Sequence, residues 1–202
     1  MSAQAKPKYA PPSPARGATR ILFQETWSTR DRARWPDPPP GRGRPAMLVP
    51  GLLAGDPSLA RMAVWLRAGG WRTTRPGIRL NVNCMEPAVE ALERRLEEVV
   101  ESTGRRALVV GQSRGGTFGR VLARCRSGPC CQVSRDQLAQ PVPEGVRYIA
   151  FYSRDDSVVS WEACLDPGAE LVEVSGTHVG MGMNRAVWKR VAELLADGLL
   201  DR

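Results

Sequence analysis

The chain has 202 residues, of which 42% are hydrophobic and 25% are charged. These values are typical of a globular domain and exclude disorder along the whole chain. The net charge is +8, but residues 1–45 carry nine basic and three acidic side chains, so six of the eight excess charges belong to this N-terminal stretch. The rest of the chain is nearly neutral, and we do not expect nucleic acid as its partner.

The sequence lacks the apolar segment of about 18 residues that a membrane-spanning helix needs. Near the N-terminus only residues 21–23 form an apolar run, which is too short for a secretory signal. We therefore expect a cytoplasmic protein whose five cysteines are reduced thiols. Cys125, Cys130 and Cys131 form a poor zinc set, because adjacent cysteines rarely share one ion. We expect no metal.

Two regions are predicted from composition. Residues 1–45 form a basic arm and linker rich in Pro and Gly, in which residues 21–35 can form a short packed helix. Residues 46–202 form one folded domain, in which short apolar runs alternate with amphipathic segments. This alternation predicts an α/β fold, with a mostly parallel sheet flanked by helices.

The elements of the folded domain can be read in chain order from hydrophobic patterning and turn residues. A buried strand ends at Pro50-Gly51, and Asp56-Pro57 provides an N-cap and a first-turn proline for the next helix. The clearest helix has apolar residues at helical spacing and charges on its other face. We predict strands at 46–49, 71–74, 107–110, 146–152 and 171–174, and helices at 56–68, 87–102, 117–124 and after Asn184.

One motif stands between a predicted strand and a predicted helix. Residues 111–115, Gly-Gln-Ser-Arg-Gly, match the pattern G-x-S-x-G, in which small residues let the chain turn sharply and present the serine at the strand tip. Ser113 is therefore the candidate nucleophile. The competing interpretation is a glycine-rich turn without chemistry, or a phosphate cradle at the helix N-terminus.

A serine nucleophile needs a base, and His178 is the only histidine of the chain. It lies in a glycine-flanked loop after the predicted strand 171–174, at the sheet edge where Ser113 is also expected. The acid should follow the preceding strand, where Asp155 and Asp156 are both candidates. The residues alone do not decide between these two aspartates.

Residues 46–196 resemble the α/β-hydrolase superfamily, in particular its lipase and esterase-like members. The order Ser113, Asp156, His178 agrees with the order of the nucleophile, acid and base in that superfamily. The resemblance favours Asp156, because the acid there commonly precedes a Val-Val or Val-Pro pair. It also implies an oxyanion hole made by the backbone N–H groups of Arg114 and of Leu52, with Leu53 as the alternative to Leu52.

The chain is shorter than such relatives between the helix after Ser113 and the strand before Asp156. The resemblance therefore implies a reduced hydrolase fold that lacks one strand and the lid. We expect the Asp156 strand to take the vacant position beside the Ser113 strand. Without a lid, the substrate cleft should be shallow, open and largely apolar, and short or medium acyl esters should be preferred.

Together these features predict a serine hydrolase of carboxylic esters, acting through an acyl-enzyme on a small-molecule substrate. Such chemistry requires neither a metal nor an organic cofactor. Two alternatives remain open: an acyltransferase that uses the same three residues, and a non-catalytic ligand-binding or interaction protein on a degenerate hydrolase fold. The oligomeric state is not predicted.

Overall fold

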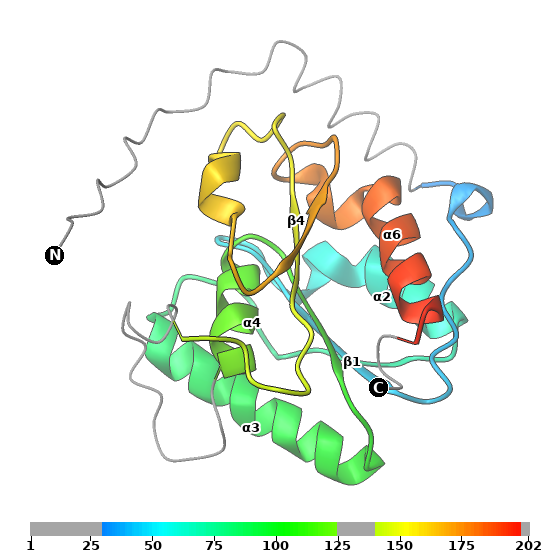
Figure 1. The fold of residues 1–202 in the computed structure, drawn as a ribbon. Helices are drawn as coiled ribbons and strands as arrows, with labels where there is room; N and C mark the ends of the chain where they lie inside the picture. Colours follow the sequence, from blue (N-terminus) through cyan, green and yellow to red (C-terminus); the bar gives the residue numbers. More distant parts are fainter. Residues whose placement is uncertain (1–29, 125–139, 199–202) are drawn as a thin grey trace, which may run out of the picture.

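The computed structural model describes residues 30–124 and 140–198. Most of the predicted N-terminal arm, and Cys125, Cys130 and Cys131, lie outside the described residues. Within them the chain has an α/β fold in which parallel strands are flanked by helices (Figure 1). The coarse fold class expected from the sequence is thus confirmed.

The first sheet contains β1 (Pro45–Val49), β2 (Arg72–Thr74) and β3 (Leu108–Gly111), in the order β2-β1-β3. Both strand pairs are parallel. All five residues of β1 are buried, as expected of an apolar run in the centre of a sheet that is covered on both faces.

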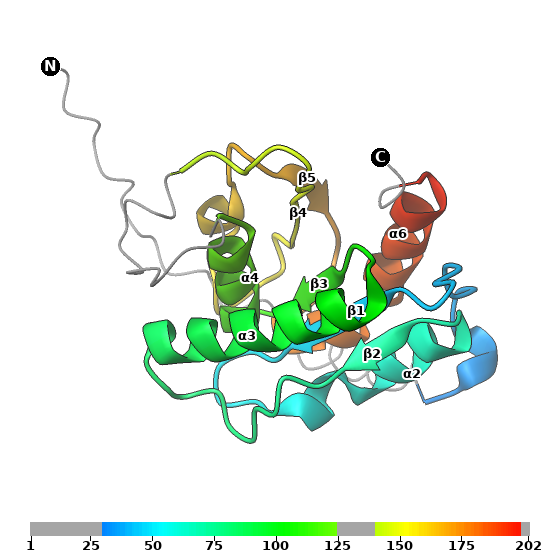
Figure 2. The same ribbon diagram turned by 90° about the horizontal axis from the view of Figure 1, so that it is seen from below.

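Two pairs of helices cover the two faces of this sheet. Successive side chains of β1 point to opposite faces. Ala46 and Leu48 pack in one core cluster with α2 (Ala60–Ala68) and α6 (Arg185–Ala196). The other cluster joins Met47 and Val49 to α3 (Met85–Thr103) and α4 (Arg114–Arg124). Figure 2 shows the same arrangement from a second direction.

The remaining strands form a second sheet, which differs from the single sheet expected from the sequence. In it β4 (Ile149–Tyr152) and β5 (Glu170–Glu173) pair in parallel. Among the described residues β4 pairs only with β5, and β3 only with β1. The strand before Asp156 is therefore not hydrogen-bonded to β3 as a continuous sheet would require, and the sheet is divided at that point.

Several boundaries differ from the prediction. The helix expected from Asp56 begins as the 3-10 helix η2 (Asp56–Leu59), and its N-cap is Gly55. The carboxylate of Asp56 accepts hydrogen bonds from the N–H groups of Gly77 and Ile78 instead of capping the helix. Three further 3-10 helices complete the described elements: η1 (Arg32–Arg34), η3 (Trp161–Cys164) and η4 (Gly180–Met183).

The Pro- and Gly-rich stretch before β1 packs on the folded domain. The indole N–H groups of Trp65 and Trp71 donate to the carbonyl oxygens of Pro36 and Pro39, each at 2.8 Å. Within the described ranges, no helix is long and apolar enough to cross a membrane.

Candidate active site

Ser113 stands at a sharp turn between β3 and α4, because the strand ends at Gly111 and the helix begins at Arg114. Its backbone φ is 53°, in the left-handed region that residues with a side chain rarely adopt. The residue is exposed to solvent. A strained serine presented at a strand tip is the geometry that the G-x-S-x-G pattern predicts.

Two glycines of the motif permit this turn because the backbone passes close to them. A Cβ atom on Gly111 would lie 2.2 Å from the carbonyl oxygen of Gly115. A Cβ atom on Gly115 would lie 2.2 Å from the carbonyl oxygen of Val49 in β1. Both contacts are with backbone, which cannot rotate away, so only glycine fits at these two positions.

Gly115→Ala should therefore destabilise the fold by about 1–3 kcal/mol, because the added methyl group forces α4 away from β1. Gly119→Ala in the same helix is the matched control, since a Cβ there meets nothing closer than Val109 Cγ1 at 3.9 Å. That substitution should raise stability by about 0.5–1 kcal/mol. Urea unfolding of both variants measures the difference, and equal effects would contradict the close approach.

His178 lies between Ser113 and Asp156. Its Nε2 atom is 2.8 Å from Ser113 Oγ, and its Nδ1 atom is 2.7 Å from Asp156 Oδ2. An ionised carboxylate only accepts hydrogen bonds, so Nδ1 carries the proton and donates it to Asp156. In the neutral imidazole, Nε2 is then the acceptor for the Ser113 hydroxyl. This arrangement can move the serine proton to the ring.

The loop that carries His178 is held by hydrogen bonds from both sides. The side-chain amide of Gln112 donates to the carbonyl oxygens of His178 and Val179, at 3.3 and 3.2 Å. The side-chain amide of Asn184, which also caps α6, donates to the carbonyl oxygen of Ser175 at 2.7 Å. The imidazole position therefore depends on Gln112, which adjoins the serine, and on the start of α6.

Asp156, rather than Asp155, is the aspartate in contact with the imidazole. Asp156 Oδ1 accepts the N–H groups of Val158 and Val159 at 2.8 and 2.9 Å. Burial favours the neutral carboxyl, but the bonds from His178, Val159 and Val158 outweigh it and lower the pKa of Asp156 below its ordinary value. Asp155 instead accepts a hydrogen bond from the Ser175 hydroxyl.

The lowered pKa of Asp156 makes a prediction about stability and pH. A carboxyl with a depressed folded-state pKa adds stability above its unfolded-state pKa of about 3.9, and loses it as pH falls through the folded-state value. Asp156→Asn cannot accept from His178 as a carboxylate does, so it should be about 1–3 kcal/mol less stable near pH 7. That deficit should shrink below about pH 4. Chemical unfolding across this range measures it, and a constant deficit would contradict the assignment.

The two backbone N–H groups expected near an oxyanion lie on segments that adjoin Ser113. Arg114 is the first residue of α4, and a Cβ on Gly51 would lie 3.2 Å from Ser113 Cβ. Leu53 donates its N–H to the carbonyl oxygen of Asn81 at 3.3 Å. In the described part of the chain neither Leu52 nor Arg114 has an acceptor for its N–H group. The geometry thus favours Leu52 over Leu53.

Sequence reasoning missed the residue that shapes the loop after β1. Asn81 is buried, and its side-chain amide donates to the carbonyl oxygen of Pro50 at 2.8 Å. Its own carbonyl oxygen accepts from Leu53 and from the Arg114 guanidinium. That guanidinium also lies over the Phe118 ring, 5.2 Å from its centroid. No local motif marks Asn81, because its partners are backbone groups distant in sequence.

The side chains of Ser113, His178 and Asp156 form one hydrogen-bonded series. Among residues 30–124 and 140–198, no cluster of three or more His, Cys, Asp or Glu side chains could hold a metal ion. The fold and site together define an α/β protein with a hydrogen-bonded Ser-His-Asp arrangement at the edge of its strands. No protein-family model and no curated protein matches the chain.

Proposed function

We propose that the chain is a serine hydrolase of carboxylic esters, of α/β-hydrolase type but reduced by one strand and the lid. The observation that carries the proposal is the contact series from Ser113 through His178 to Asp156, at 2.8 and 2.7 Å. Ser113 is exposed, has a positive φ, and faces an imidazole that a carboxylate orients. A turn without catalytic function would not require this combination.

In the proposed reaction, His178 Nε2 accepts the Ser113 proton while Oγ attacks the ester carbonyl carbon. The N–H groups of Leu52 and Arg114 stabilise the oxyanion, at about 2.7–4 kcal/mol for each donor. The imidazolium, stabilised by Asp156, returns its proton to the leaving alcohol, and an acyl-serine remains. Water then attacks the acyl carbon, gives its proton to His178, and releases the acid while the proton returns to Ser113.

The surroundings of Ser113 favour an apolar ester. Leu52 follows Gly51 and Val179 follows His178, and their exposed fractions are 54% and 61%. Further exposed apolar side chains occur at Leu53, Leu80, Val82 and Val158. The hydrogen bond from Leu53 to Asn81 joins the loop after β1, which carries Leu52 and Leu53, to the loop before α3, which carries Leu80 and Val82. An apolar substrate would cover such side chains, which are otherwise left in water.

The test is reaction of the folded protein with a fluorophosphonate probe, which phosphonylates activated serines. We expect one adduct, located on Ser113 by peptide mass spectrometry, together with hydrolysis of p-nitrophenyl esters. A protein that is folded by circular dichroism but carries no adduct would overturn the proposal and favour the non-catalytic alternative. Product analysis with an added alcohol separates hydrolysis from acyl transfer.

A further inference from the structure

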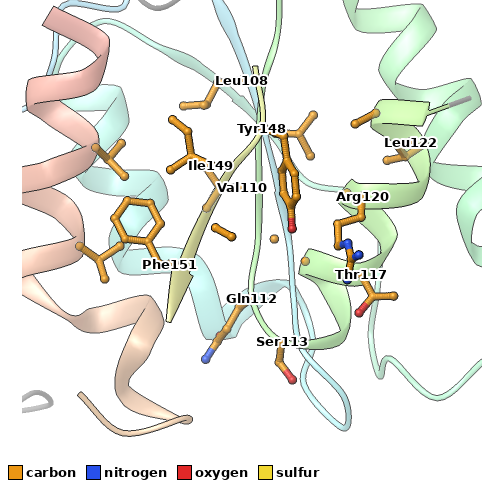
Figure 3. A pocket seen from close by; sticks show the side chains of 18 of the residues that line it. Leu108, Val110, Gln112, Ser113, Thr117, Arg120, Leu122, Tyr148, Ile149 and Phe151 are labelled. Carbon is orange, nitrogen blue, oxygen red and sulfur yellow. The ribbon is translucent and has the colours of Figure 1, made fainter. Parts of the chain in front are cut away.

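A cavity of about 670 Å³ opens between β3 and β4. Ser113, Asp156 and His178 all line it, so it is continuous with the proposed active site. Figure 3 shows Leu108 and Val110 of β3 and Ile149 and Phe151 of β4 along the cavity, with Ser113 at one end.

The cavity occupies the place where the sheet is divided. In the described chain, no strand pairs with the second edge of β3 or of β4. As a consequence, the apolar side chains Leu108, Val109 and Val110 are only half-buried, whereas every residue of β1 is buried. Burying such side chains against an apolar ligand is favourable.

The cavity extends away from Ser113 along the whole of β3. Residues 107 to 113 all line it, and this run spans about 20 Å at about 3.3 Å per residue. The helix α4 accompanies the strand, and Thr117, Gly119, Arg120 and Ala123 line its side of the cavity. The space is therefore elongated along β3.

Most of the lining residues are apolar, and the charged ones include Arg106, Arg114, Arg120 and Arg147. Arg147 is paired with Glu170 at 2.8 Å, and Arg120 is also paired. The guanidinium of Arg120 lies 2.7 Å from the carboxylate of Asp166, which is 4% exposed. On the opposite side α6 contributes Val187, Val191, Leu194 and Leu195. An elongated apolar space that ends at a nucleophile fits a hydrocarbon chain with its carbonyl carbon at the nucleophile.

We infer that the cavity between β3 and β4 is the acyl-chain site, and that it selects esters of medium and long unbranched fatty acids. This inference rests on the proposed function, because the carbonyl carbon must lie at Ser113 while the chain lies along β3. It revises the preference for short or medium acyl groups expected from the sequence. The site lies within the plane of the strands, in the division of the sheet.

Gly119→Leu tests the inference by filling the middle of the cavity. A Cβ at Gly119 has room, as its nearest contact is at 3.9 Å. The wild type should hydrolyse p-nitrophenyl decanoate with a higher kcat/KM than the acetate. In the variant, kcat/KM for the decanoate should fall at least 10-fold while that for the acetate changes less than about twofold. An unchanged decanoate-to-acetate ratio would overturn the inference.

Three further variants calibrate this result. Gly119→Ala adds only a methyl group and should keep most decanoate activity. Ala91→Leu makes a comparable enlargement at an exposed position of α3, outside the cavity, and should leave the ratio unchanged. Ala123 lies about 6 Å beyond Gly119 along α4, on the side away from Ser113, at about 1.5 Å per residue. Ala123→Phe should therefore exclude the decanoyl chain, but the longest acyl chain that it accepts should be longer than the longest accepted by Gly119→Leu. It also keeps the test valid if Gly119→Leu fails to fold.

Binding of decanoate to Ser113→Ala, followed by calorimetry, separates this inference from the proposed function. We expect saturable binding of decanoate to Ser113→Ala. Adding Gly119→Leu to this variant should raise the Kd for decanoate at least 10-fold. If decanoate binds in this way but no ester is hydrolysed, the cavity binds alkyl chains and the hydrolase proposal fails. If esters are hydrolysed with the same chain-length profile in all variants, the hydrolase proposal stands and the acyl-chain site is overturned.

Discussion

Ser113→Ala should lower kcat for ester hydrolysis by about 10⁴-fold or more, because no acyl-enzyme can form without the hydroxyl. The loss is measured with p-nitrophenyl butyrate under saturating conditions. The variant should also remain unlabelled by the fluorophosphonate probe. Stability should be nearly unchanged or slightly higher, since within the described part of the chain the exposed hydroxyl is hydrogen-bonded to His178 alone.

Ser102→Ala is the matched control for this experiment. Ser102 is also exposed, lies on α3, and donates only to the carbonyl oxygen of Val99 in its own helix. Its replacement should leave both kcat and labelling unchanged. If Ser113→Ala kept wild-type turnover, the nucleophile would be a different group, and the proposed mechanism would have to be abandoned.

His178→Ala should lower kcat by several orders of magnitude, about 10⁴-fold, because the chain has no second imidazole to accept the serine proton. Added imidazole should restore part of this activity by occupying the vacated position. The rescued rate should rise with pH through the neutral range, since only neutral imidazole accepts a proton. Steady-state assays with increasing imidazole concentration at fixed pH measure the effect.

The cost in stability distinguishes a catalytic from a structural histidine. Removing the ring takes one hydrogen bond from Asp156, whose other oxygen keeps the N–H groups of Val158 and Val159. We therefore expect a loss of at most about 3 kcal/mol. A larger loss of stability with retained turnover would identify His178 as a structural residue.

The parts of the fold that could be predicted from sequence are those set by local pattern. The apolar run of β1 and the helical spacing in α3 specify a strand and a helix wherever they are packed. The Asn184 cap was likewise predictable, and its side chain accepts from the N–H of Ala186. The helix predicted at 117–124 begins three residues earlier in the structure, because Arg114 already has helical geometry directly after Ser113.

The candidate site was predictable to the extent that sequence order determines it. Ser113, His178 and Asp156 each follow a strand, and parallel strands bring such residues to one edge. The choice of Asp156 came from the family resemblance, and its contact with His178 agrees with that choice. The roles of Gln112 and Asn81 could not be predicted, because both act on backbone carbonyl groups that only the folded chain brings near. The division between β3 and β4 could not be predicted either, because it depends on which strands pair, and those strands are distant in sequence.

Because the sheet is divided, the side chains of Ser113, Asp156 and His178 do not all follow strands of the same sheet. Ser113 follows β3 of the first sheet, whereas Asp156 and His178 follow β4 and β5 of the second. The base and its carboxylate therefore follow strands of one sheet and the nucleophile a strand of the other. A slight rotation of one sheet against the other would lengthen the contact between Ser113 and His178. It would also lengthen the hydrogen bonds from Gln112 to the carbonyl oxygens of His178 and Val179. Such a molecule would be correctly folded, but its Ser113 would lack a base and would not react. Under the proposed mechanism, the fraction of molecules that reacts with the fluorophosphonate probe would therefore equal the fraction in which the two sheets are aligned.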